Sequence, residues 1–168
     1  YKSDARINRL NKNKPIYYDE NRKNILITSA LPYVNNEPHL GNIIGCVLSA
    51  DVYARYSRLI GNNTLYVCGT DEYGTASETK ALKEGCSPKE LCDKYYKLHS
   101  EIYDWFNIDF DIFGRTSTEP HTKITTEIFS KLKQNNNIVK EKTEQYKCMK
   151  CNMFLADKYV YGECNSCK

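Results

Sequence analysis

Residues 24–42 read Asn-Ile-Leu-Ile-Thr-Ser-Ala-Leu-Pro-Tyr-Val-Asn-Asn-Glu-Pro-His-Leu-Gly-Asn, and this stretch decides the fold. The apolar run at 25–27 is long enough for a buried strand and too short for a helix. Pro32 ends the strand because proline has no N–H to donate to a ladder. The asparagines and Pro38 that follow are typical of a turn. The stretch therefore predicts a strand that leads into a polar loop.

A helix is predicted to follow that loop. Apolar side chains recur with the spacing that lines one helical face, at Leu40, Ile43, Ile44, Val47 and Leu48. His39, Gly41 and Asn42 then fall in the first turn. A helix start presents unpaired N–H groups and about half a positive charge, which makes it a natural phosphate site.

Three residues of that first turn suit a nucleotide. His39 and the amide of Asn42 can each donate to a phosphate oxygen. Gly41 has no side chain, which leaves room for a flat base against the backbone. The alternative is a helix that begins Pro-His-Leu-Gly by chance, because short motifs often match without function.

The next segments complete a βαβ unit. The helix is expected to end near Gly61, a natural C-terminal cap, and residues 64–68 are β-branched and aromatic, as in a strand. The carboxyl ends of parallel neighbours lie at one edge of the sheet, so Asp71 is predicted to meet a ligand in that crevice. Its carboxylate suits a substrate ammonium group. The alternative role is to cap the next helix. We interpret Glu72 as structural.

Later elements follow from local signals. A helix at 75–84 is predicted to end at Gly85, and a capping box with proline at 87–90 starts another. Polar and apolar residues alternate at 109–113, which predicts a strand. The second of these helices carries a core-facing stripe at Leu91, Tyr95, Leu98, Ile102 and Trp105.

A last helix is predicted to carry Ile124, Ile128 and Leu132, and to close at residues 135–137. His99 and His121 are both predicted to lie on helix surfaces.

Cysteine spacing is the second informative pattern. Four of the eight cysteines form two Cys-x-x-Cys pairs separated by twelve residues, at Cys148, Cys151, Cys164 and Cys167. Two such pairs can hold one zinc ion through four thiolates, which leaves no open position and makes the metal structural. The alternatives are four free thiols or two disulfides. The other cysteines are scattered through helix and strand patterns, which fits a reducing compartment.

Composition sets the outer limits. The chain has 168 residues, enough for one domain or one with an appendage, and a formal charge of +3 that permits RNA contact without arguing for it. No apolar run reaches membrane-spanning length, and no signal peptide is recognisable. Residues 1–23 are polar and basic without apolar periodicity, as in an extended leader. The first residue is not Met, and we expect the chain to be a piece of a longer protein.

Three strings taken together resemble a known family. They are Ala30-Leu31-Pro32-Tyr33, His39-Leu40-Gly41-Asn42, and residues 68–75, which read Cys-Gly-Thr-Asp-Glu-Tyr-Gly-Thr. The combination resembles methionyl-tRNA synthetase of the eukaryotic cytosolic type, in which His-Leu-Gly-Asn is the version of the class I signature His-x-Gly-His. The resemblance runs from about residue 24 to the end of the chain. It implies an α/β fold: the first half of a Rossmann-like catalytic domain at 24–117, with a parallel sheet, and the start of a zinc-knuckle connective peptide at 118–168.

The resemblance also implies an activity and roles for residues. The enzyme would activate methionine with ATP and Mg²⁺ to methionyl-adenylate, and transfer it to tRNA(Met) in the cytoplasm. Methionine would be bound by Ala30, Leu31, Tyr33 and Asp71. ATP would be bound by His39, Gly41 and Asn42, of which His39 and Asn42 would act in catalysis. Asn42 stands where the bacterial pattern has a second histidine, so it keeps a donor and loses a possible positive charge.

Two other classes of function stay open. One is a different nucleotidyltransferase with a His-x-Gly-His-like helix start. The other is a zinc-ribbon module that binds RNA without catalysis. The sequence has no Lys-Met-Ser-Lys-Ser string, the second phosphate-binding signature of class I synthetases. We therefore expect that this chain by itself does not aminoacylate.

Overall fold

The structure is a computed structural model that describes residues 16–142, 144, 146–150 and 152–154. It divides into two compact units, 1–118 and 119–168, and each is described by itself. The first contains β1 (Asn24–Thr28), α1 (Leu40–Asn42), the π-helical segment η2 (Ile43–Leu48), α2 (Ser49–Leu59), β2 (Asn63–Thr70), α3 (Thr75–Glu84), α4 (Pro88–Trp105) and β3 (Ile112–Arg115). The second contains α5 (Glu119–Gln134), β4 (Lys147–Cys148) and β5 (Met153–Phe154).

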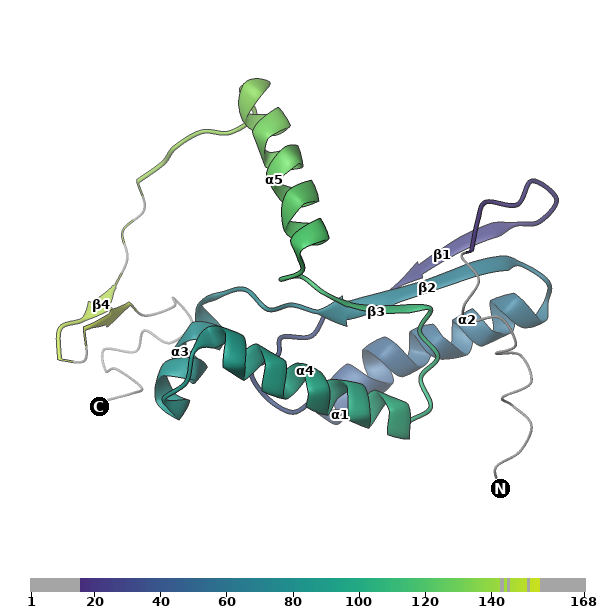
Figure 1. The fold of residues 1–168 in the computed structure, drawn as a ribbon, viewed down its shortest axis with the longest axis horizontal. Helices are drawn as coiled ribbons and strands as arrows, with labels where there is room; N and C mark the ends of the chain where they lie inside the picture. Colours follow the sequence, from purple (N-terminus) through teal and green to yellow (C-terminus); the bar gives the residue numbers. More distant parts are fainter. Residues whose placement is uncertain (1–15, 143, 145, 151, 155–168) are drawn as a thin grey trace. The chain divides into compact units, whose positions relative to one another are not determined.

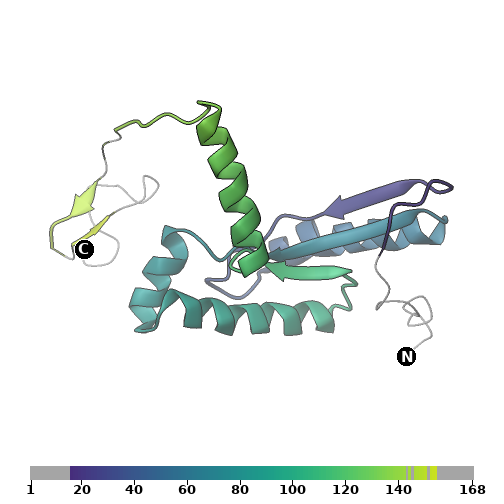
Figure 2. The same cartoon turned by 45° about the horizontal axis from the view of Figure 1, so that its top comes forward.

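A parallel sheet of order β1-β2-β3 organises the first unit (Figure 1). In its register, Ile27 pairs with Tyr66, and Val67 pairs with Ile112. The three arrowheads point the same way, so the carboxyl ends of the strands share one edge (Figure 2). The predicted βαβ unit is confirmed, and the shared edge is where such sheets bind ligands.

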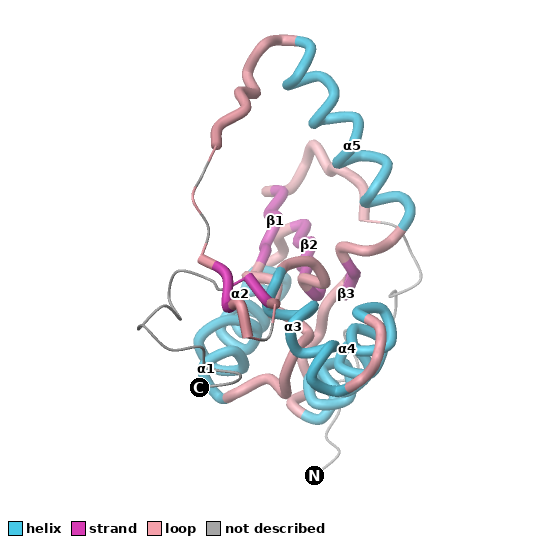
Figure 3. The backbone as a smooth tube through the Cα atoms, turned by 90° about the vertical axis from the view of Figure 1, so that its left-hand side faces the viewer, coloured by secondary structure: helices cyan, strands magenta, loops and turns pink. Residues whose placement is uncertain are grey.

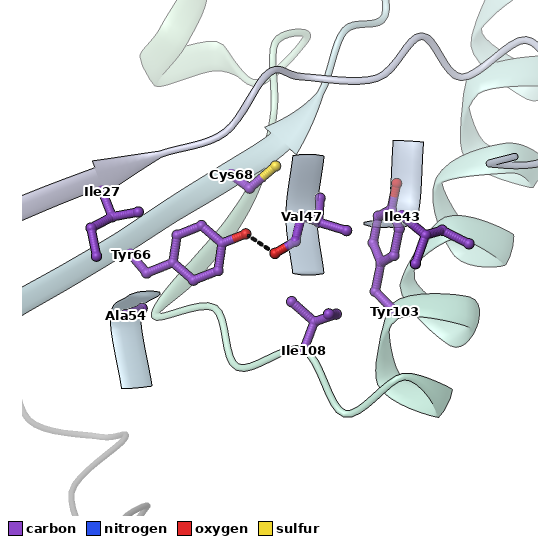
Figure 4. Packing of buried hydrophobic residues seen from close by; sticks show 8 residues of the cluster. All are labelled: Ile27, Ile43, Val47, Ala54, Tyr66, Cys68, Tyr103 and Ile108. Carbon is purple, nitrogen blue, oxygen red and sulfur yellow. Dashed lines mark hydrogen bonds between the residues drawn. The ribbon is translucent and has the colours of Figure 1, made fainter. Parts of the chain in front are cut away.

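Helices α2 and α4 lie on the same face of the sheet (Figure 3). Right-handed crossovers produce this arrangement, because the chain steps in one direction from β1 to β2 to β3. Between helices and sheet lies the main core, made of Ile27, Ile43, Val47, Ala54, Tyr66, Cys68, Tyr103 and Ile108 (Figure 4). The Tyr66 hydroxyl donates to the Val47 carbonyl at 2.9 Å, and burial raises the pKa of this phenol. The Tyr66 hydroxyl is thus satisfied, as burial requires, whereas the Tyr103 hydroxyl in the same layer has no hydrogen-bond partner in the described chain.

The first helix is not the regular helix that was predicted. Residues 43–48 are π-helical, with i→i+5 hydrogen bonds in place of i→i+4. Not all of the apolar side chains of this segment are buried. Ile43 and Val47 are buried and Leu48 is half-buried, but Leu40 and Ile44 are 64% and 56% exposed. The prediction that Leu40 and Ile44 belong to the core-facing side is therefore wrong.

The third strand begins three residues later than predicted, at Ile112. Asp111 gives the physical reason, because its carboxylate accepts from the Tyr66 N–H at 2.7 Å and from Arg58 at 2.6 Å. The Asp111 side chain thus accepts the hydrogen bond from the Tyr66 N–H of β2, just before the main-chain pairing with β3 begins. The Asp109 N–H likewise donates to a carboxylate, at 2.7 Å. The strand is thus confirmed at 112–113, whereas the polar positions at 109 and 111 serve side-chain hydrogen bonding.

Helix boundaries follow the local signals. Gly85 ends α3 at φ 69°, and Ser87 and Glu90 form the predicted capping box at the start of α4. Two predictions about the surface of α4 are wrong. Trp105 is 80% exposed and packs against Phe106 rather than the core. His99, predicted on the surface, is 1% exposed because it lies on the same buried stripe as the residues four positions before and after it.

In the second unit, α5 has acidic Glu119 in its first turn and lysines in its last. His121 is exposed in the first turn, as predicted. The apolar side chains of the predicted stripe are exposed to 58%, 54% and 43% at Ile124, Ile128 and Leu132. β4 and β5 pair antiparallel. No helix in the described part of the chain is both long and apolar enough to cross a membrane.

Candidate active site

The tips of β1 and β2 bring Tyr33 and Asp71 together. These residues form a parallel bridge, in which the Asp71 N–H donates to the Pro32 carbonyl at 2.9 Å and the Val34 N–H donates to the Asp71 carbonyl at 3.4 Å. β1 ends at Thr28, four residues before Pro32, so the prediction that Pro32 ends this strand is wrong, and the bridge is an isolated pair directly after the proline. The Tyr33 side chain is 55% exposed. An aromatic residue and an acidic residue are thus paired through their main chains at the ligand-binding edge of the sheet.

Asp71 does not cap the following helix. Its Oδ1 accepts the Tyr73 N–H at 3.2 Å, and the N-cap of α3 is Gly74, which has no side chain to contribute. The alternative role considered for Asp71 is therefore wrong. Gly74 has φ 119°, a conformation that favours glycine, and a Cβ there would lie 3.9 Å from the Tyr33 ring.

His39 and Asn42 cap one another at the helix start. The Asn42 N–H donates to His39 Nδ1 at 3.3 Å, and the His39 N–H donates to Asn42 Oδ1 at 3.3 Å. Because Nδ1 accepts, the neutral imidazole carries its proton on Nε2. Because Oδ1 also accepts, Nδ2 is the end of the Asn42 amide that remains to donate. Both side chains can therefore offer donors at the mouth of a continuous helical segment, where an anion is favoured.

Gly41 lies under the His39 ring. A Cβ built on Gly41 would be 2.9 Å from His39 Cε1 and 3.0 Å from Nδ1, closer than side chains pack. A side chain at this position would push the imidazole away from its bond to Asn42. Glycine therefore preserves the cap, a role that the sequence did not indicate.

Two thiols lie against the carbonyl of Ala30. Cys46 donates to this oxygen at 3.4 Å, and Cys68 Sγ lies 3.8 Å from it and 3.7 Å from the Gly69 carbonyl, the two acceptors for its one proton. Burial raises the pKa of Cys68, which keeps the thiol protonated and able to donate. Leu31 and Tyr33 follow on the same segment with exposed side chains. Three of the four residues expected to bind methionine, Ala30, Leu31 and Tyr33, thus share one segment, whereas Asp71 follows β2.

Glu72 holds the end of β2 in place through a buried hydrogen-bond network. Its carboxylate accepts from Arg115 Nε at 2.6 Å, from Thr70 Oγ1 at 3.1 Å, and from the hydroxyl of Ser117. The Glu72 side chain is only 2% exposed. Arg115 also binds Asp93 of α4 at 2.6 Å, so a single guanidinium joins β3, α4 and the loop after β2. The structural role predicted for Glu72 is confirmed, whereas the sequence did not indicate its partners.

His99 reaches the loop between β1 and α1 from α4. Its Nε2 lies 2.8 Å from the carbonyl oxygen of Asn36, and this nitrogen must carry the proton because a carbonyl only accepts. Burial lowers the pKa of the imidazole. In the described chain its Nδ1 is buried without a hydrogen-bond partner. Spacing could have found this residue, because His99 lies four positions from the aromatic residues Tyr95 and Tyr103, which are both buried.

The predicted site residues fall into two groups. Tyr33 and Asp71 are paired, and His39 is assembled with Gly41 and Asn42. Among the described residues, no hydrogen bond joins one group to the other. The zinc prediction stays a prediction, because Cys148 is described and half-buried in β4 while the other ligands lie outside the described residues, at Cys151, Cys164 and Cys167.

Comparison with known proteins then decides the family. The family model described as tRNA synthetases class I (M) matches residues 25–168. The chain belongs to this family. A probable cytoplasmic methionine–tRNA ligase of Dictyostelium discoideum is 63% identical over 157 residues, which are 93% of this chain and 21% of that protein. The cytoplasmic methionine–tRNA ligase of Homo sapiens is 61% identical over 153 residues, 91% of this chain and 17% of that protein.

This class I (M) chain therefore spans about a fifth of the length of the curated relatives it matches. Its fold also matches solved structures. Mycobacterium tuberculosis methionyl-tRNA synthetase in complex with methionyl-adenylate superposes with a TM-score of 0.71 at 23% identity, over 82% of this chain and 27% of that one. At this identity the likeness shows the α/β fold alone.

Proposed function

We propose that this chain is part of a cytoplasmic enzyme that activates methionine with ATP and transfers it to tRNA(Met). Residues 24–117 would form the first half of the catalytic domain, and residues 118–168 the start of the connective peptide. The names of the relatives support this proposal. The observation that carries it is the Tyr33–Asp71 bridge, which is linked by one loop to a helix start capped by His39.

Asp71 is proposed to hold the ammonium group of methionine. One of its carboxylate oxygens accepts from the Tyr73 N–H, which orients the group, and the other can accept a charge-assisted hydrogen bond from the substrate. The methionine side chain would lie along the segment that contains Ala30, Leu31 and Tyr33. The exposed Leu31 and Tyr33 side chains offer apolar surface there.

ATP is proposed to bind at the helix start, accompanied by Mg²⁺. His39 Nε2 and Asn42 Nδ2 would donate to phosphate oxygens, and Gly41 would lie under the adenine. The methionine carboxylate attacks the α-phosphorus, the bond from that phosphorus to the bridging oxygen breaks, and pyrophosphate leaves. A hydroxyl of the tRNA then displaces AMP from the methionyl-adenylate. The residues contribute positioning and charge stabilisation, and no enzyme nucleophile is required.

We also propose a structural zinc ion held by Cys148, Cys151, Cys164 and Cys167. The donor set is four thiolates, the set typical of closed zinc sites. Cys148 ends β4, which pairs antiparallel with β5 in a short hairpin that suits a zinc knuckle. We expect one zinc ion per chain by atomic emission, and less than half of that in Cys148→Ser. A metal content unchanged by this substitution would contradict the ligand set.

The test of the main proposal is His39→Ala in the full-length protein, with His121→Ala as the control. Both histidines are exposed at the start of a helix, but only His39 lies at the proposed site. We expect methionine-dependent ATP–pyrophosphate exchange to fall by roughly 100-fold in His39→Ala, as when one donor to a developing charge is removed. His121→Ala should keep wild-type exchange.

Two other results would favour other functions. If exchange survives in His39→Ala and only RNA affinity falls, the chain belongs to an RNA-binding module. If wild-type exchange depends on a substrate that is not an amino acid, the chain belongs to another nucleotidyltransferase.

A further inference from the structure

We infer that His99 is a positioning residue for the ATP half of the site, which it serves by holding the loop that leads to His39. The inference rests on the proposed function. The contact is the 2.8 Å hydrogen bond from His99 Nε2 to the Asn36 carbonyl, which joins positions 63 residues apart. Asn36, the partner in this bond, is not one of the residues proposed to contact a substrate. Any effect of His99 on catalysis would therefore pass through the loop.

The two ends of this loop are held by different means. At the Tyr33 end, two main-chain hydrogen bonds connect the loop to Asp71, and the Val34 side chain is fully buried against α3 and α4. At the His39 end, the His99–Asn36 bond is the one hydrogen bond that ties residues 35–38 to another element in the described part of the chain. Pro38 is buried and His39 is capped to Asn42, so removal of His99 should loosen residues 35–37, which lead to His39, and spare the Tyr33 end.

The position of His99 is a costly one for a polar side chain. It lies between two apolar clusters, four residues after Tyr95 in one cluster and four residues before Tyr103 in the other. Its ring is 1% exposed and packs edge-on against Tyr103 at 5.8 Å, with Nδ1 unpartnered. A buried polar atom without a partner destabilises the fold, and an apolar residue here would join the two clusters.

The hydrogen bond from His99 to Asn36 adds little stability to offset the cost of burying the imidazole. Asn36 is exposed, so water could satisfy its carbonyl if His99 were replaced. Local choices that oppose stability are expected where function requires them. What the bond supplies is a fixed path for the loop just before His39. A displacement of about 1 Å at a reacting group can lower a rate by about 100-fold, which makes such a constraint valuable.

Three variants of the full-length protein test the inference. His99→Phe keeps a ring of similar size and removes the donor. His99→Gln keeps an N–H donor that can reach the Asn36 carbonyl. Tyr103→Phe is the matched control, because Tyr103 is equally buried one turn further along α4 and its hydroxyl has no hydrogen-bond partner in the described chain.

The readouts are methionine-dependent ATP–pyrophosphate exchange, normalised to the folded fraction from circular dichroism, and amide hydrogen exchange in residues 35–42. In His99→Phe we expect kcat/KM for ATP to fall roughly tenfold. This is the factor that corresponds to the free energy of about one hydrogen bond. The KM for methionine should stay within twofold. Amides at 35–42 should exchange faster. His99→Gln should recover most of the activity, and Tyr103→Phe should behave as wild type.

Several results would overturn the inference. They are a kcat/KM for ATP in His99→Phe within twofold of wild type, an equal rise of both KM values, a His99→Gln variant no better than His99→Phe, or an equal loss in Tyr103→Phe. A wild-type protein without methionine-dependent exchange would instead refute the proposed function. In that case amide exchange still tests whether the His99–Asn36 bond holds the loop. Unchanged exchange at 35–42 in His99→Phe would show that it does not.

Discussion

At the scale of single residues, Gly41 and the His39 ring compete for one small volume. In Gly41→Ala the new Cβ would lie 2.9 Å from His39 Cε1, so the imidazole must turn and give up its bond to the Asn42 N–H. We expect kcat for methionine-dependent exchange in the full-length protein to fall at least about tenfold, because the phosphate donor is misplaced. Stability should change by less than about 1 kcal/mol, since alanine favours a helix over glycine by about that amount.

Gly45→Ala is the control for this substitution. Gly45 lies in η2, in the same continuous helical segment, and a Cβ there meets nothing within 4 Å. If Gly41→Ala and Gly45→Ala show the same kcat, crowding of the His39 ring has no part in catalysis.

The buried imidazole of His99 also makes folding depend on pH. Burial lowers its pKa in the folded state below the value near 6.5 of the unfolded chain. As pH falls through 6.5, the unfolded chain binds a proton that the folded chain does not, so the free energy of unfolding decreases. For one proton the slope cannot exceed about 1.4 kcal/mol per pH unit. Urea unfolding of this chain between pH 7.5 and about pH 5 should show a weaker pH dependence in His99→Phe; equal slopes would contradict this linkage.

At the scale of elements, the Glu72–Arg115 pair connects the tip of β2 to β3 and α4. Arg115→Met would leave the Glu72 carboxylate, 2% exposed, without its cation. We expect the free energy of unfolding, measured with urea, to fall by about 3 kcal/mol, the usual effect of breaking a buried pair from one side. Lys97→Met is the control: the Lys97–Glu101 pair on α4 is 80% and 62% exposed, and its loss should change stability by less than about 1 kcal/mol. Similar values for the two variants would show that the Glu72 network does not stabilise the fold.

Elements were predictable where their signals are local. The capping box of α4, the glycine after α3 and the His39–Asn42 turn each depend on residues within four positions, and all three are confirmed. The start of β3 was not predictable, because Asp111 binds the main chain of β2, 45 residues away. The hydrogen bond of His99 was not predictable for the same reason, because its partner is 63 residues away, although the spacing of the buried residues on α4 could have indicated its burial. In the candidate site, the sequence could therefore indicate which residues form the site, but not the long-range hydrogen bonds and ion pairs that hold them in place.

At the scale of the whole molecule, the sheet has one face covered by α2 and α4, whereas its other face carries exposed apolar side chains. Leu26 of β1 and Ile112 of β3 are 67% and 53% exposed, and they pair in register with Leu65 and Val67, which are half-buried. These four residues, at neighbouring positions on three strands, form an apolar patch. Parallel sheets are almost always covered on both faces, and exposed apolar patches favour association.

We therefore expect the 168-residue chain to self-associate with rising concentration, and Leu26→Thr/Ile112→Thr to reduce this association. Threonine has a β-branched side chain suited to a strand and lowers the apolar area, so the fold should be retained. Sedimentation velocity over a concentration series measures the effect. Val139→Thr is the control, because Val139 is 77% exposed but lies outside the sheet. A wild-type chain that stays monomeric throughout, or a Val139→Thr variant that reduces association as much, would show that this face of the sheet does not drive contacts between molecules.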